Sequence, residues 1–215
     1  AFEGHICSSR YLFSLFKRRM FFCGIQRKIV WSPYGVDDEL CVPSEILALK
    51  RHATSHFEIL HIGSLAKGYG CMFMIQGLRE LLALRADWSM CFVGGGPDYA
   101  EVTSAARSLG LEDHVTFTGY APEEILREKL AGADVYLSHL NDTEKDWARC
   151  PSKLYYYMAQ GKPVVTPALG ENHVALGGDG FYYQHDNPSD FARALSAAMD
   201  AANSWMPRYD PTSVG

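Results

Sequence analysis

Residues 151–167 read Pro-Ser-Lys-Leu-Tyr-Tyr-Tyr-Met-Ala-Gln-Gly-Lys-Pro-Val-Val-Thr-Pro, a pattern that predicts a helix followed by a short buried strand. Pro151 and Ser152 are typical of a helix start, because a proline suits the first turn and a hydroxyl can cap free amides. Apolar side chains then recur at helical spacing up to Gly161, which ends the helix. A helix start offers unpaired N–H groups and the positive end of the helix dipole, so it can hold a phosphate. An ordinary helix–strand unit without a ligand is the alternative, since such units are common in α/β sheets.

Strand and helix patterns alternate at least five times after residue 57. Such alternation predicts the α/β class, here a Rossmann-like parallel sheet with helices on both faces and right-handed crossovers. Ligands bind such sheets beyond the carboxyl ends of the strands. The segments that follow predicted strands, and that we expect along this edge, are residues 63–70, 94–97, 138–152 and 166–173.

The composition is that of a globular protein, with 47% apolar and 21% charged residues in a chain of 215. A formal net charge of −5 argues against a nucleic-acid-binding protein, and no apolar run reaches the roughly 20 residues that span a membrane. The six cysteines are scattered and form no Cys-x-x-Cys pair, so we expect no zinc site, no other metal cofactor and a cytoplasmic location. One basic and aromatic run at residues 16–22 is compatible with contact to a membrane surface, but a solvated helix end is the favoured interpretation.

Residues 63–70, Gly-Ser-Leu-Ala-Lys-Gly-Tyr-Gly, form a glycine-rich loop between a predicted strand at 57–62 and a predicted helix at 72–82. Strand, glycine-rich loop and helix is the arrangement that brings backbone N–H groups against a phosphate. The spacing is neither G-x-G-x-x-G nor a Walker motif, and a tight turn that needs glycine conformations explains the loop equally well. The Gly-Gly-Gly-Pro turn at 94–97 has two similar explanations, which are close approach of another group to its backbone and a plain tight turn.

The run Pro-Ser-Lys-Leu-x-x-Tyr-Met-Ala-x-Gly-Lys-Pro-Val-Val resembles the donor-site helix of the retaining GT-B glycosyltransferases grouped as family 4. The loop at 63–70 and the turn at 94–97 are also similar to that family, and they occur in the required order. The resemblance implies the C-terminal half of a GT-B fold. The chain departs from the family at two glutamates separated by seven residues, whose places are taken by Ala148 and Tyr156.

The resemblance implies an enzyme that transfers a sugar from a nucleoside diphosphate sugar to an acceptor, which the sequence does not name, with retention. Its site would act by position and electrostatics, with backbone amides and a cation holding the departing diphosphate. Lys67 and Lys153 are the candidate cations, and Tyr156 would replace a ribose-binding glutamate. The full set of donor-binding candidates implied in this way is Gly63, Ser64, Lys67, Gly68, Gly95, Tyr120, Ser152, Lys153, Tyr156, Gly170, Glu171 and Asn172.

A catalytic carboxylate is expected from the segment at 138–152, where the family has its first glutamate. Glu144 is the candidate, with Asp146 as its neighbour in the same segment. A solvated charged loop without a catalytic role is the favoured alternative.

The resemblance also divides the chain. Residues 1–35 would be a remnant of an N-terminal acceptor domain with its linker, residues 36–206 a nucleotide-sugar-binding domain, and residues 207–215 a tail. The chain would then lack most of the acceptor half. A non-catalytic nucleotide-sugar-binding domain is the second hypothesis, favoured by the missing glutamate pair. A nucleotide-sugar epimerase, which shares the GT-B architecture, is a weaker third.

Overall fold

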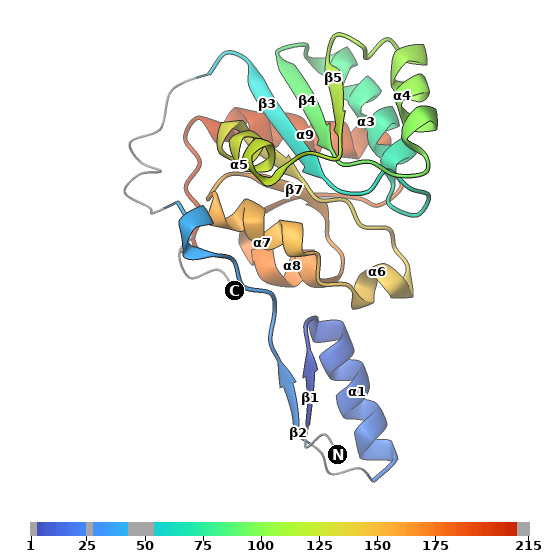
Figure 1. Cartoon of the computed structure of the whole chain (residues 1–215), viewed down its shortest axis with the longest axis vertical. Helices are drawn as coiled ribbons and strands as arrows, with labels where there is room; N and C mark the ends of the chain where they lie inside the picture. The colour runs from blue at the N-terminus through green and yellow to red at the C-terminus, as the bar shows by residue number, and fades with distance from the viewer. Residues whose placement is uncertain (1–3, 25–27, 43–53, 210–215) are drawn as a thin grey trace.

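The computed structural model describes residues 4–24, 28–42 and 54–209, and its largest part is one parallel β-sheet (Figure 1). Within these residues the six strands of this sheet lie in the order β5-β4-β3-β6-β7-β8. The chain builds the sheet outward from β3 to β5, returns to the other side of β3 and continues to β8, which is a doubly wound arrangement. The predicted parallel sheet is confirmed. Its strands are β3 (Phe57–Ile62), β4 (Trp88–Val93), β5 (Val115–Gly119), β6 (Val135–Leu137), β7 (Val164–Pro167) and β8 (Gly180–Tyr183).

Helices cover both faces of this sheet, as the alternating patterns predict. Side chains of α3, α4 and α9 share one apolar cluster with the sheet, and side chains of α5, α7 and α8 share the other. The helices are α3 (Cys71–Leu84), α4 (Tyr99–Ser108), α5 (Glu123–Gly132), α7 (Ser152–Ala159), α8 (Gly170–Leu176) and α9 (Pro188–Ala202).

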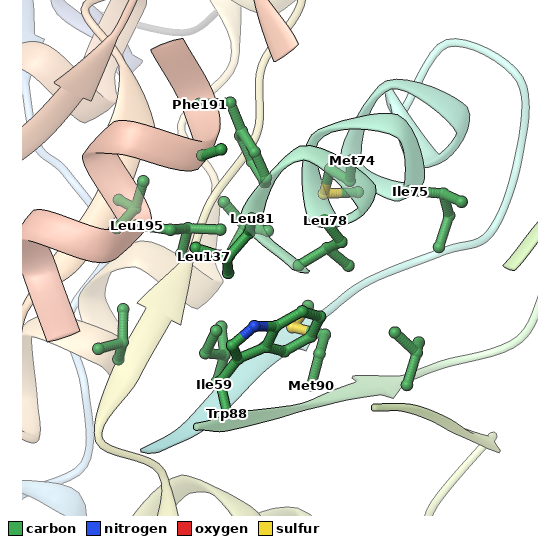
Figure 2. Close-up of a cluster of buried hydrophobic side chains, with 14 of the residues drawn as sticks. Ile59, Met74, Ile75, Leu78, Leu81, Trp88, Met90, Leu137, Phe191 and Leu195 are labelled. Carbon is green, nitrogen blue, oxygen red and sulfur yellow. The ribbon is translucent and has the colours of Figure 1, made fainter. Parts of the chain in front are cut away.

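The larger core lies between the sheet and helices α3 and α9 (Figure 2). Trp88 of β4 is fully buried there, and its indole N–H donates a hydrogen bond of 2.8 Å to the carbonyl oxygen of Arg85. Gly77 allows α3 and α9 to pack closely, because a Cβ at that position would lie 2.2 Å from the ring of Phe191. This core gives the loops at the carboxyl edge of the sheet a rigid base.

The N-terminal residues form a small unit of their own, in which β1 (Gly4–Cys7) and β2 (Lys28–Trp31) pair in parallel and α1 (Arg10–Phe22) connects them. Ser9 caps α1 by accepting a hydrogen bond of 3.2 Å from the N–H of Leu12. The Ser9 hydroxyl also donates a hydrogen bond of 2.8 Å to the carbonyl oxygen of Ala148. The start of α1 is therefore attached to the carboxyl edge of the large sheet, as Figure 1 shows.

The segment at 138–152 contains a short helix that the sequence did not predict, α6 (Glu144–Ala148). Thr143 caps it by accepting a hydrogen bond of 3.2 Å from the N–H of Asp146. Five residues complete less than two turns, so they carry no apolar periodicity that a sequence pattern could reveal.

The last described residues contact the turn that precedes β8. The backbone N–H of Arg208 donates a hydrogen bond of 2.8 Å to the carboxylate of Asp179, and the guanidinium adds a second at 3.0 Å. The predicted tail at 207–215 is described only as far as residue 209. Among the described helices we find none whose length and apolar content would allow it to cross a membrane.

Candidate functional site

The end of β3 meets the start of α7 at the carboxyl edge of the sheet. Strands β3 and β6 are neighbours, so the connection from β6 to α7 passes beside the loop that follows β3. The Tyr157 hydroxyl accepts a hydrogen bond of 2.8 Å from the N–H of Ile62, the last residue of β3. The Tyr157 ring stacks on Tyr136 of β6 with ring centroids 4.5 Å apart. These contacts fix α7 against the ends of two strands.

Gly63 and Lys153 face each other across this junction. A Cβ atom on Gly63 would lie 3.3 Å from Nζ of Lys153 and 3.1 Å from Nε2 of His61. The structure therefore brings together two segments, the loop at 63–70 and the start of α7, that the sequence marks separately as candidate anion sites. Glycine permits this close approach, because any side chain at residue 63 would crowd both groups.

Lys153 is partly buried, and its ammonium group makes no hydrogen bond or ion pair with any residue that the structure describes. Desolvation and, to a lesser extent, the nearby charge of Arg149 lower the pKa of Lys153 from its usual 10.5 to about 7. A desolvated cation without a counter-ion is costly, so an anion bound here would be stabilised. The backbone N–H groups of Ser152 and Lys153 open α7 and have no partner within the helix, which adds donors and the helix dipole to the same place.

His61 is the second polar group at this junction, and its side chain is buried in β3. Its Nδ1 donates a hydrogen bond of 2.9 Å to the carbonyl oxygen of Leu137, so Nε2 remains as an acceptor. Burial and the positive charge of Lys153 lower the pKa of His61 well below its usual range, although the Leu137 carbonyl acts in the other direction. The imidazole is therefore neutral, and the charge at the junction is that of Lys153.

The glycines of the turn at 94–97 are explained by contact between two loops. A Cβ atom at Gly94 would lie 2.1 Å from the carbonyl oxygen of Gly63, and one at Gly96 would lie 2.3 Å from that of Leu65. The N–H of Leu65 donates a hydrogen bond of 2.9 Å to the carbonyl oxygen of Gly95. The group that closely approaches these glycines is thus the backbone of residues 63–65, which the turn holds in place.

Tyr120, just after β5, is 85% exposed. Its ring covers Gly95, since a Cβ atom there would lie 2.7 Å from Cε2 of Tyr120. An exposed aromatic ring at the carboxyl edge suits a flat ligand such as a nucleobase, because stacking tolerates any base. The predicted role of Tyr120 and Gly95 in donor binding stays a prediction.

Lys67 is exposed and lines a different cavity of about 210 Å³, which Asp98, Glu101 and Asn141 also line. Two carboxylates beside this lysine make the cavity a poorer place for a phosphate than the Gly63–Lys153 junction. Gly68, the next residue, has a φ of +84° and no atom near its missing Cβ, so its glycine serves the backbone conformation.

Asp146 organises the connection between β6 and α7, and it is only 2% exposed. It accepts hydrogen bonds of 2.8 Å from the N–H of Asn141 and 2.8 Å from Nη1 of Arg149. Burial opposes its ionisation, but Arg149 and Asn141 outweigh burial and lower the pKa of Asp146. The Arg149 guanidinium in turn lies 4.7 Å from the ring centre of Tyr69. Asp146 is therefore engaged in holding this connection together.

Glu171 and Asn172 lie at the start of α8 and are buried. The Glu171 carboxylate accepts a hydrogen bond of 2.8 Å from the backbone N–H of Arg10, and burial raises the pKa of Glu171. The Asn172 amide donates to both Ser138 and Thr166 at 2.9 Å, which ties the ends of β6 and β7 together. Its Oδ1 has no hydrogen-bond partner among the described residues. Gly170 precedes them at a φ of +52° and gives α8 room to start beside α6.

The remaining candidates lie around α6 and α7. Glu144 is exposed on α6, and its Oε1 accepts a hydrogen bond of 3.2 Å from the hydroxyl of Tyr11. Ser152 is exposed at the first position of α7, whereas Tyr156 is partly buried and packs against the smaller apolar core. In the part of the chain that the structure describes, no group of three or more acidic, cysteine or histidine side chains is placed to hold a metal ion.

Two residues of the junction were missed by sequence reasoning. His61 is a polar residue inside an otherwise apolar strand pattern, and Arg149 is a basic residue four positions before Lys153. Both residues can be noticed in the sequence. Their closeness to Lys153 follows only from the strand order, which places β3 beside the connection from β6 to α7.

Comparison with known proteins agrees with this architecture. The sequence model of the family Glycosyl transferases group 1 matches residues 56–201. The chain belongs to this family. Among similar curated proteins, the 2-deoxystreptamine glucosyltransferase of Streptomyces kanamyceticus is 30% identical over 118 residues, which cover 52% of this chain and 30% of that protein. The chain thus spans about a third of the length of such relatives.

Solved glycosyltransferase structures share the GT-B fold of this chain. A mutant of S. aureus TarM, crystallised with fondaparinux, alpha-GlcNAc-glycerol and UDP, superposes with a TM-score of 0.73 at 13% identity and covers 98% of this chain and 39% of that one. Anabaena Alr3699/HepE, in complex with UDP and glucose, superposes with a TM-score of 0.68 at 20% identity and covers 99% of this chain and 58% of that one. At such identities the likeness concerns the fold alone.

Proposed function

We propose that this member of the family is the donor-binding part of a retaining, family 4-type transferase, which moves a sugar from a nucleoside diphosphate sugar to an acceptor. The observation that carries the proposal is the Lys153 ammonium, which lies beside Gly63 at the carboxyl edge of the sheet without a counter-ion in the described structure. A diphosphate would supply that counter-ion. The complexes of Alr3699/HepE and TarM with UDP support this choice of ligand.

The residues at the junction have separate tasks in this proposal. The Lys153 ammonium and the N–H groups that open α7 hold the diphosphate and stabilise its charge as it departs. The exposed ring of Tyr120 supports the base by stacking, and Tyr156 takes the ribose position with one hydroxyl. Glu144 remains the proposed carboxylate on the acceptor side, because it is exposed on α6 beside α1.

Because the matched relatives are about three times longer than the segment they share with this chain, we expect the 215 residues to bind the donor without transferring its sugar. An acceptor domain preceding residue 36, with residues 1–35 as its end, is part of the proposal, as is a cytoplasmic location. Incubation with labelled UDP-, GDP- and ADP-sugars and mixed acceptors should give no product, and turnover by the chain alone would contradict this part.

Titration of the chain with UDP, GDP and ADP by calorimetry tests the donor site directly. We expect one of the three to bind, and we expect Lys153→Met to weaken its binding by about tenfold or more, since a charge-assisted hydrogen bond contributes roughly 1.5–3 kcal/mol. Lys17→Met is the matched control, because Lys17 is exposed on α1 and should leave binding unchanged. Equal binding by wild type and a folded Lys153→Met protein would refute the site.

A further inference from the structure

A second cavity lies at the same edge of the molecule, between α1 and the connection that contains α6. Its volume is about 520 Å³, and its walls are Tyr11, Asp142, Thr143, Glu144 and Trp147. We propose that this cavity binds one sugar ring of the acceptor, and that the ring is neutral or carries an amino group. The proposal rests on the proposed transferase function and adds the chemical class of the acceptor to it.

The two aromatic residues form the flat part of the cavity. Tyr11 comes from α1 and Trp147 from α6, and their ring centroids are 6.4 Å apart with the ring planes tilted by 44°. Both side chains are partly exposed. Aromatic side chains combine a large apolar surface with a polar group, and they line small-molecule sites in which a few placed polar groups fix the orientation of the ligand. A sugar ring has apolar C–H faces and a hydroxyl rim, which fits such walls.

The polar groups beside the rings are two carboxylates, each held by one of them. The Trp147 indole N–H donates a hydrogen bond of 2.7 Å to Oδ1 of Asp142, and the Tyr11 hydroxyl donates one of 3.2 Å to Oε1 of Glu144. The second oxygen of each carboxylate has no partner among the described residues. A carboxylate oxygen accepts hydrogen bonds from hydroxyl or ammonium groups and donates none. The free oxygens therefore suit the hydroxyl groups of a neutral sugar or the ammonium group of an amino sugar.

The charges around the cavity disfavour an acidic sugar. The wall carries Asp142 and Glu144, and the ammonium of Lys145 is directed elsewhere, 5.6 Å from the ring centre of Tyr69. Arg18 and Arg19 act on the Tyr11 hydroxyl from two turns along α1, but they are not part of the wall. A uronic acid or a phosphorylated sugar would bring a like charge next to the two carboxylates, which costs affinity.

The cavity is built on a fixed support. Its α6 wall is held by Asp146, which bonds Asn141 on one side and Arg149 on the other. Ser9 ties α1 to the end of α6 through its bond of 2.8 Å to Ala148. Arg149 also lies close enough to Lys153 to lower the pKa of that lysine. The connection that forms the cavity wall therefore also carries a charge that acts on the donor site.

Saturation-transfer NMR on the 215-residue chain, with methyl α-glucoside, glucosamine and glucuronate as the probes, tests the proposal. We expect the first two to bind in the millimolar range and glucuronate to bind at least about tenfold more weakly at low salt. Trp147→Ala should abolish the signal, whereas Trp147→Phe keeps a ring and should retain it. The double variant Asp142→Asn, Glu144→Gln should bind glucuronate as well as it binds methyl α-glucoside. Melting curves show which variants are folded, and the Trp147→Phe and double variants decide the result if Trp147→Ala does not fold.

Three outcomes would overturn the proposal: no binding of any of the probes, equal binding of the three by wild type, or unchanged binding by a folded Trp147→Ala protein. The binding of UDP to the same proteins tests the donor site separately. Lys153→Met should weaken UDP binding and leave the sugar probes unaffected. Loss of the sugar result alone would therefore refute the acceptor cavity, and loss of the UDP result alone would refute the donor site.

Discussion

The ammonium nitrogen of Lys153 lies 3.3 Å from the position that a Cβ atom would take on Gly63. This separation joins two loops that are about 90 residues apart in the sequence, and it depends on glycine at the end of β3 and on α7 beginning beside it.

Gly63→Ala should weaken binding of a nucleoside diphosphate by about tenfold, because the new methyl group would meet both Lys153 Nζ and the buried imidazole of His61. Calorimetric titration with UDP measures the change. Gly132→Ala is the matched control, since nothing lies within 4 Å of a Cβ at that position and binding should stay as in wild type. Tight UDP binding by Gly63→Ala would show that the diphosphate does not bind at this junction.

Binding of UDP-glucose should weaken as the pH rises through about 7, where Lys153 loses its proton in the free protein. Above that pH the diphosphate must bind together with a proton, so affinity falls by up to about tenfold per pH unit. Lys153→Arg stays charged throughout, and its affinity should change little between pH 6 and about 8.5. Calorimetry in buffers of different ionisation enthalpy would also show proton uptake by wild type alone. Parallel pH profiles for the two proteins would contradict the assignment.

The same lysine should make the free protein more stable as the pH rises above about 7. The pKa of Lys153 is lower in the folded chain, about 7, than its usual value of 10.5, so the unfolded chain binds more protons between these values. The free energy of unfolding then increases with pH in that window. Urea denaturation at a series of pH values measures this increase, and Lys153→Met should lack it. A wild-type profile that is flat or falls as that of the variant does would argue against a desolvated Lys153.

Tyr156→Glu should tighten UDP or GDP binding by about tenfold or more, since a carboxylate can accept hydrogen bonds from both ribose hydroxyls where a phenol accepts less well. Calorimetric titration of both proteins measures the gain. Tyr156 is partly buried against the smaller core, so a melting curve is needed for the variant. Unchanged or weaker binding by a folded Tyr156→Glu protein would remove Tyr156 from the ribose site.

Asp146→Asn should lower the free energy of unfolding by about 1–3 kcal/mol, because it removes the buried charge that pairs with the partly exposed Arg149. The pKa of Asp146 is lowered in the folded chain, so its contribution is present above the usual carboxyl range and is lost as the pH falls through the folded value. Urea denaturation of the variant and of Asp113→Asn, an exposed aspartate elsewhere, provides the comparison. Equal losses in the two variants would mean that the connection does not depend on this ion pair.

The sequence predicted the strands and helices of the sheet because their patterns are long and regular. The strand at residues 88–93 was predicted with the bounds that β4 has, and all its residues except Ser89 are apolar, as expected for a strand covered on both faces. The helix α6 was missed because five residues have no periodicity. Because α6 forms part of the wall of the candidate acceptor cavity, the sequence patterns did not predict that cavity.

Only some residues of the candidate donor site could be predicted from the sequence. Lys153 and Gly63 were predicted from a helix start and a glycine-rich loop, which are local signals. The roles of His61 and Arg149 depend instead on which strands are neighbours, and strand order is a property of the whole sheet. Glu171, in contrast, was predicted from the sequence to face the donor. In the structure its carboxylate accepts a hydrogen bond from the backbone N–H of Arg10.

The three glycines after β4 have a consequence for how the donor loop can vary. Besides the packing of Leu65 in the larger core, residues 63–65 are held by main-chain atoms of a turn about thirty residues further along the chain. A substitution at Ser64 should therefore leave the positions of the neighbouring backbone amides unchanged. A substitution at Gly94 or Gly96, by contrast, would displace the neighbouring loop without ever meeting a ligand. The shape of the loop at 63–70 therefore depends on the sequence of another loop, the turn at 94–97.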